Sequence, residues 1–309
     1  MIDPGATLFG RLVDHAGLLP PAPLDMQTAV AAYRHARTGP GSWIVGRFLV
    51  PATKLEELAT VLVTTMTARE RPWEVGVVVD TDLGSAVATA AAFHRELHPG
   101  ASIVTAEARL DGGADGAAVE RIHRALGAIA DDVAAFVEVD VTGPAARVAH
   151  DVTTAAETIT RSHRPGGVAL RGEGPTPDQN PAPDAVAAFV TSATAAGVPF
   201  KATAGLDHPI RCDDASRGAT HHGFVNLLVA AALAIDDAPS DVVTAAVADT
   251  DRSAFGLSLG GFRWRDRRFT STTLQRTRSR GLIGYGSRDL ASPVAELAAM
   301  GLIAAEGMR

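Results

Sequence analysis

The chain of 309 residues is 46% hydrophobic and 20% charged, and its formal net charge is −7. Acidic and basic residues are mixed along the chain without a basic stripe, so a nucleic-acid partner is not expected. The sequence has no apolar run near the roughly 20 residues that span a bilayer, no signal-peptide pattern, and only one cysteine, Cys212. We therefore expect a cytoplasmic protein without membrane contact or an internal disulfide.

Short apolar runs alternate with longer helical stretches along the chain. The expected strands span residues 8–16, 43–50, 74–80, 102–110, 134–141, 167–174, 200–206 and 282–287. Apolar residues at helical spacing predict helices over 23–37, 53–66, 83–97, 116–129, 143–158, 183–197, 220–235 and 292–301. Strand–helix alternation repeated in this way predicts parallel strands joined by right-handed crossovers.

Eight such units predict an α/β fold, a (β/α)8 TIM-like barrel that forms a single domain over residues 1–309. Before the last strand, the sequence predicts an extra helix at 241–249 and a hairpin at 255–271. An open doubly wound sheet is the alternative, although the chain lacks a G-x-G-x-x-G turn after an early strand.

Catalytic side chains of barrel enzymes come from the C-terminal ends of the strands. The polar residues at these predicted ends are Asp14, His15, Arg47, Asp80, Glu107, Arg109, Glu138, Asp140, Arg171, Glu173, Lys201 and Thr203. Because side chains alternate along a strand, Glu138 and Asp140 are expected to face the interior, as are Lys201 and Thr203. Charges of both signs then converge on one cavity, as an active site or as a structural ion-pair network.

Lys201 is the candidate catalytic residue that the composition singles out. Of the 28 Lys and Arg residues, only Lys54 and Lys201 are lysine. Lys54 begins an amphipathic helix, where a solvated role is enough, whereas Lys201 lies inside an apolar strand. A buried lysine that loses its proton can form a Schiff base or act as a base, which arginine cannot do. The alternative is a lysine that is paired with Glu138, Asp140 or Glu173 and is chemically inert.

A polar segment follows the seventh strand and leads into the helix expected from Thr220. It supplies His208 as a candidate acid or base and Arg211, His222 and Asn226 as candidate substrate-binding residues. Arg211 and the first N–H groups of that helix could hold a phosphate or carboxylate. The alternative is an ordinary solvated connection. The Pro- and Gly-rich segment 172–184 is expected to cover the site or to form a surface loop.

No cofactor is predicted, and a divalent metal is kept as an alternative. The ligands would be Glu107, Glu138 and Asp140, or His15 with His208. The sequence contains no H-x-H, H-E-x-x-H or C-x-x-C pattern.

Three stretches together resemble a family of uncharacterised bacterial proteins: DHAGLLPPAPLDM, PFKATAGLDHPIR followed by HHGFVNLLVAAALA, and GYGSRDLASPVAELAAMGLI. The family pattern is K-x-T-A-G-L-H-H-P-x-R, then H-G-F-x-N, then a terminal G-S-C-S-F-x-E-P. The residues that match it are Lys201, Thr203, His208, Arg211, His222 and Asn226. Asp207 and the stretch Gly286–Asp289, which includes Arg288, depart from it. The resemblance implies the fold and the site residues rather than a substrate.

Three functions remain open at this point. The leading one is an aldolase-like lyase acting on a small anionic carbonyl compound, with Lys201 as imine former or base. His208, Glu107, Glu138 or Asp140 would move protons, and Arg47, Arg171 and Arg211 would hold the anionic group. The others are an enolising isomerase, with or without a metal, and a non-catalytic binding barrel. A small-molecule substrate is expected, and a homo-oligomer is an option.

Overall fold

Eight parallel strands close into a barrel in a computed structural model that describes residues 3–21, 23–173, 176, 179–214, 219–258 and 260–304. The strands are β1 Val13–His15, β2 Val45–Pro51, β3 Trp73–Val78, β4 Ala101–Arg109, β5 Ala134–Val139, β6 Gly166–Arg171, β7 Phe200–Thr203 and β13 Leu282–Ser287. They pair in chain order around the barrel, and β13 closes it by lying between β7 and β1. The predicted (β/α)8 barrel is confirmed, and the open-sheet alternative is wrong.

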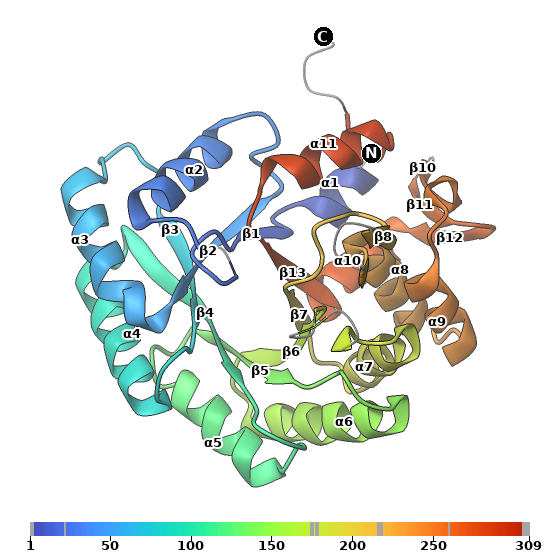
Figure 1. The fold of residues 1–309 in the computed structure, drawn as a ribbon, viewed down its shortest axis with the longest axis horizontal. Helices are drawn as coiled ribbons and strands as arrows, with labels where there is room; N and C mark the ends of the chain where they lie inside the picture. The colour runs from blue at the N-terminus through green and yellow to red at the C-terminus, as the bar shows by residue number, and fades with distance from the viewer. Residues whose placement is uncertain are drawn as a thin grey trace.

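A ring of helices surrounds the barrel (Figure 1). These helices are α2 Met26–Thr38, α3 Leu55–Thr65, α4 Leu83–Leu97, α5 Gly116–Leu126, α6 Ala145–Ser162, α7 Pro183–Ala195, α8 Phe224–Ile235 and α11 Ala291–Ala299. Three of them begin at an aspartate, Asp25, Asp82 or Asp115, whose side chain accepts a backbone N–H of the first turn. Among the described helices, none is long and apolar enough to cross a membrane.

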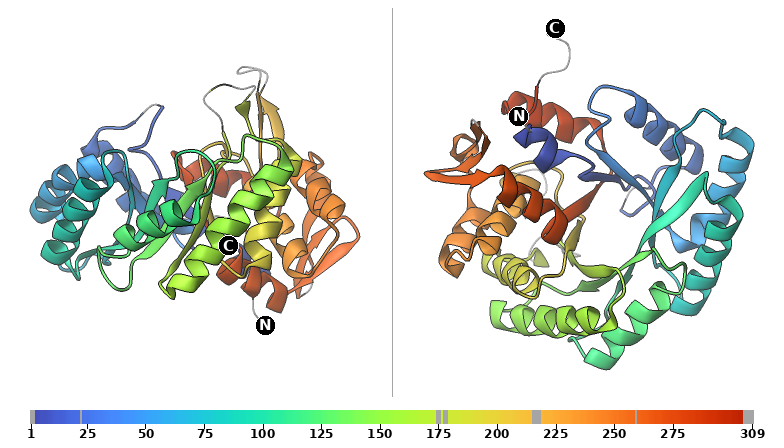
Figure 2. Two further views of the ribbon diagram at one scale, coloured as in Figure 1. Left: turned by 90° about the horizontal axis from the view of Figure 1, so that it is seen from below. Right: turned by 180° about the vertical axis from the view of Figure 1, so that it is seen from behind.

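The segment before β13 holds the predicted extra helix and hairpin. The helix is α9 Ser240–Ala248. The hairpin strands β10 Phe255–Ser258 and β11 Gly261–Trp264 gain a third antiparallel partner, β12 Arg267–Thr270, and α10 Ser271–Arg280 follows. A second hairpin, β8 Cys212–Asp214 with β9 Ala219–His221, projects from one end of the barrel (Figure 2, left).

Several predicted boundaries differ from the structure by a few residues, and two of the differences change the type of element. The predicted first strand at 8–16 is helix α1 Pro4–Phe9 followed by the three-residue β1, because Asp3 caps the helix. The helix expected from Thr220 begins at Phe224, because residues 219–221 pair with β8.

The two faces of the strands carry different side chains. Phe48 and Trp73 point outward and pack with Tyr33 of α2, and Tyr285 stacks on Phe224 of α8 at a centroid distance of 4.7 Å. Two layers of inward-facing residues matter for the site. The upper layer, which lies toward the C-terminal ends of the strands, includes Arg109, Glu138, Arg171, Thr203 and Gly286. The lower layer, one inward-facing position deeper on each strand, includes Asp14, Glu107, Phe136, Lys201 and Gly284.

Candidate functional site

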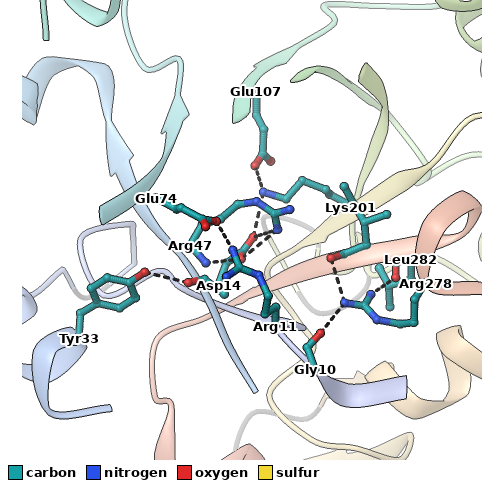
Figure 3. A network of polar contacts seen from close by, with 12 residues as sticks. Gly10, Arg11, Asp14, Tyr33, Arg47, Glu74, Glu107, Lys201, Arg278 and Leu282 are labelled. Atoms are coloured by element: carbon teal, nitrogen blue, oxygen red, sulfur yellow. Dashed lines mark hydrogen bonds and ion pairs between the residues drawn. The ribbon is translucent and has the colours of Figure 1, made fainter. Parts of the chain in front are cut away.

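Lys201 occupies the centre of the lower layer and is enclosed by two carboxylates. Its Nζ lies 3.0 Å from Asp14 Oδ2 of β1 and donates a hydrogen bond to Glu107 Oε1 of β4 (Figure 3). It also lies 5.9 Å from the ring centroid of Phe136. The side chain of Lys201 is 0% exposed. The predicted inward orientation of Lys201 is present in the structure, but its acidic partners are Asp14 and Glu107 rather than the expected Glu138, Asp140 or Glu173.

Asp14 connects Lys201 to a second cation. One oxygen of Asp14 accepts the backbone N–H of Arg47 at 2.8 Å, and the Arg47 guanidinium lies 3.3 Å away. Burial alone would raise the pKa of Asp14, but the charges of Lys201 and Arg47 outweigh it and hold the pKa below its usual value. Asp14 is therefore the shared anion of two buried cations.

Glycines make room for this buried cluster. A Cβ at Gly284 would lie 3.0 Å from Arg47 Nη1 and 3.2 Å from Asp14 Oδ2.

Further toward the N-terminal ends of the strands, Arg11 pairs with Glu74, and Arg278 of α10 donates to the carbonyls of Gly10 and Leu282 (Figure 3). Burial lowers the pKa of Arg278 to about 10, and Arg47 adds to the effect. Part of the predicted charge cluster is thus an ion-pair network that fills the barrel.

Two adjoining cavities lie above this cluster, at the C-terminal ends of the strands. The first mouth cavity has a volume of about 410 Å³ and the second about 380 Å³. They share five lining residues, which are Pro20, Pro21, Arg171, Glu173 and Ala204. Lys201 lies one inward-facing position below Thr203, which lines the first cavity. We call the two cavities together the mouth.

Glu138 joins three strands at the second mouth cavity. Its Oε1 accepts from Arg171 Nε at 3.3 Å, and its Oε2 accepts from Thr203 Oγ1 at 3.1 Å. Of the carboxylates predicted to act on the substrate, Glu138 and Asp140 line the second mouth cavity, whereas Glu107 lies in the layer below. Arg171 and Thr203, predicted to bind the substrate, both line the mouth.

Arg288 and Asp207, two departures from the family pattern, meet in the first mouth cavity. Arg288 Nη2 lies 3.6 Å from Asp207 Oδ2, and both residues line the cavity. The two departures therefore form one ion pair between the loop after β7 and the end of β13.

His208, Arg211, His222 and Asn226 form a neighbouring structural cluster outside the cavities' linings. His208 Nδ1 pairs with Glu296 of α11 at 2.8 Å, and Arg211 Nη1 contacts His222 Nδ1 at 3.1 Å. Burial lowers the pKa of His222 to about 4, and the Arg211 charge adds to the effect. The sequence pattern predicted that these four residues lie in the site. In the described part of the chain, their contacts instead hold the loop after β7 in position.

The start of α8 does not present free N–H groups to an anion. The N–H of Phe224 donates to His208 O at 3.2 Å, and that of Val225 donates to Pro209 O at 2.9 Å. Asn226 Oδ1 accepts the N–H of Arg211, while its amide donates to the carbonyls of Ala246 and Asp249. The N–H groups of Phe224 and Val225, at the predicted anion site, are therefore already bonded to backbone carbonyls.

The carboxylates proposed as metal ligands have separate partners. Glu107 binds Lys201, Glu138 binds Arg171, and Asp140 accepts from Thr142 and Arg147. These hydrogen bonds and the Arg147 charge overcome the effect of burial and lower the pKa of Asp140. His15 packs outward against Tyr33 and Phe48, apart from His208. No group of three potential ligands that could hold a metal ion occurs within the described part of the chain.

Three residues of the site were not predicted from the sequence to act there. Asp14 was recognised at a strand end but not as a partner of Lys201, and its inward position in a polar first strand was the available signal. Lys54 and Arg109 line the first and second mouth cavities, respectively. Segment 172–184, expected to cover the site, falls partly outside the described residues.

The chain matches no protein-family model and no curated protein. The resemblance of residues 201–226 to the family pattern stays a prediction.

Proposed function

We propose that the protein is an enzyme acting on a small anionic carbonyl compound that binds in the mouth, as an aldolase-like lyase with Lys201 as the reacting amine. The observation that carries the proposal is a fully enclosed lysine, held between Asp14 and Glu107, one layer below a cavity lined by Arg171, Lys54 and Arg288. Catalytic groups at the C-terminal ends of barrel strands are typical of this fold.

The carboxylates provide the proton transfers that an imine requires. Lys201 gives one proton to Glu107, and the neutral Nζ attacks the carbonyl carbon. The carbonyl oxygen then takes one proton from the attacking amine and the other back from Glu107, and leaves as water. The protonated imine then accepts the electron pair of the neighbouring C–C or C–H bond, while a carboxylate takes the proton of the departing group. Glu107 Oε2 is buried with no hydrogen-bond partner among the described residues, so it can accept a proton. The reaction requires the substrate carbonyl to pass Thr203 and reach the lower layer.

An enolising isomerase is the second candidate, and the exposure of Glu138 to the second mouth cavity favours it. Glu138 would take the proton next to the carbonyl, Arg171 would hold the anionic group, and Lys201 would remain a buried counter-ion. This route needs no contact between the substrate and Nζ.

Deuterium exchange tests whether carbonyl activation occurs. The protein is incubated in D2O with 2-oxo acids of three to six carbons, and proton NMR follows the loss of the C–H signal next to the carbonyl. We expect exchange with at least one compound in the wild type. Lys201→Arg keeps a cation between Asp14 and Glu107 but cannot form an imine, so it should lose the exchange.

Arg121→Gln is the control, because it removes an exposed arginine of α5 outside both mouth cavities. It should retain exchange. Absence of exchange with every compound, in a wild-type protein whose folding is verified by circular dichroism, would contradict the proposed function. Exchange that persists in Lys201→Arg would favour the Glu138 route.

A further inference from the structure

The mouth combines separated cations with an apolar wall. Lys54 follows β2 and lines the first mouth cavity, and Arg109 ends β4 and lines the second. Because β3 lies between β2 and β4, and neighbouring strands are about 4.8 Å apart, β2 and β4 are roughly 10 Å apart. The two cations therefore line different parts of the mouth.

The acids around the mouth are mostly satisfied by the protein. Asp80 accepts from Thr53, Asp140 from Thr142 and Arg147, and Asp207 pairs with Arg288. Glu138 is bound by Arg171 and Thr203.

The side chains of Lys54 and Arg109, by contrast, have no hydrogen bond or ion pair to the part of the chain that the structure describes. Glu173 is the remaining acid with no such partner there, and it lines both cavities beside Arg171. The side chains of two cations at the mouth therefore lack an anionic partner within the described residues. Glu173, which lines both cavities, can accept a hydrogen bond from a ligand hydroxyl.

Apolar side chains line much of the first mouth cavity. They are Leu18, Leu19, Pro20, Pro21, Pro23, Val78 and Val79. An apolar wall with a few charged groups at defined points fits a ligand that has a short hydrocarbon middle and charged ends.

We infer that the substrate is a dianion whose two acidic groups bind Lys54 and Arg109, with Arg171 serving the middle of the mouth. This inference rests on the proposed function, since it names the substrate class of the same site. It replaces Arg47 and Arg211 as anion-binding residues, because neither of them lines the mouth cavities, whereas Arg171 lines both.

Calorimetric titration of linear α,ω-dicarboxylates of four to seven carbons tests the inference, each compared with the monocarboxylate of equal length. We expect one dicarboxylate to bind at least tenfold more tightly than its monocarboxylate partner. Lys54→Gln and Arg109→Gln should each weaken that dicarboxylate about five- to tenfold and leave the monocarboxylate within about twofold. Arg121→Gln, which removes an exposed arginine of α5, is the matched control and should bind as the wild type does.

The inference is overturned if no dicarboxylate binds, if dicarboxylates and monocarboxylates bind equally, or if both mouth variants retain wild-type affinity. The titrations require no turnover, so their failure is distinct from a failure of the proposed function. Deuterium exchange without preference for dianions overturns the inference alone. Preference for dianions without exchange overturns the proposed function alone.

Discussion

At the scale of single residues, the two lysines of the chain lie in different environments. Lys201 is fully enclosed between Asp14 and Glu107, whereas Lys54 is partly exposed at the mouth. Strand alternation predicted the inward orientation of Lys201 from the sequence. The partnership with Asp14 could not be predicted in the same way, because it depends on barrel closure, which places β13 between β7 and β1.

Lys201→Met should destabilise the fold, because it leaves two carboxylates buried without their shared cation. We expect the free energy of unfolding to fall by roughly 3–5 kcal/mol at pH 7, as measured by urea denaturation. Lys54→Met, the same change at the mouth, should alter it by less than about 0.5 kcal/mol. Equal effects of the two substitutions would mean that the enclosed ion cluster does not hold the barrel interior together.

At the scale of elements, the loop between β7 and α8 shows where sequence patterns stop being sufficient. The histidines at 221 and 222 precede an apolar helix, which made them resemble helix-start residues. Instead, β8 and β9 form a hairpin whose register pairs Cys212 with His221, and α8 begins after Gly223. An antiparallel pairing of only three residues on each strand leaves little periodicity to detect. The same applies to β12, whose exposed and charged residues hide its pairing with β11.

Asn226→Ala tests whether this cluster supports the structure. The substitution leaves the N–H of Arg211 and the carbonyls of Ala246 and Asp249 without their hydrogen-bond partner. The Asn226 side chain that bonds them is buried. We expect a loss of about 3 kcal/mol in urea denaturation. Thr244→Ala, which removes an exposed helix hydroxyl of α9, is the control and should have little effect. If Asn226→Ala instead keeps full stability and abolishes ligand binding, the structural role assigned to Asn226 is wrong.

At the scale of the whole molecule, repeated strand–helix units were sufficient to predict the closed barrel, since each element carries its own periodicity. The position of the mouth also follows from the fold, because the C-terminal strand ends converge there. The division of charges between a buried network and the mouth could not be predicted, since Arg47 and Arg171 have the same strand-end pattern in the sequence. Their different depths follow from how far β2 and β6 extend above each residue.

Stability should fall as the pH drops from about 6.5 toward 4. Burial lowers the pKa of both His15 and His222 to about 4, so in this range the unfolded chain binds protons that the folded protein does not. Unfolding is then favoured by about 2 kcal/mol per histidine on going from pH 7 to pH 5. Urea denaturation at the two pH values measures the loss.

His15→Phe keeps a ring between Tyr33 and Phe48 and should reduce this pH dependence by about half. His150→Gln, at an exposed position of α6, should leave it unchanged. An identical pH dependence in His15→Phe and the wild type would show that His15 titrates normally in the folded protein.

Borohydride trapping followed by mass spectrometry of the intact protein tests most directly whether Lys201 is the reacting amine. The protein is incubated with the panel of 2-oxo acids and sodium borohydride, and peptide mapping locates any added mass. The account predicts one adduct per chain, located on Lys201, present in Arg121→Gln and absent from Lys201→Arg. An adduct that maps elsewhere, or the absence of any adduct from a protein that still catalyses deuterium exchange, would contradict it.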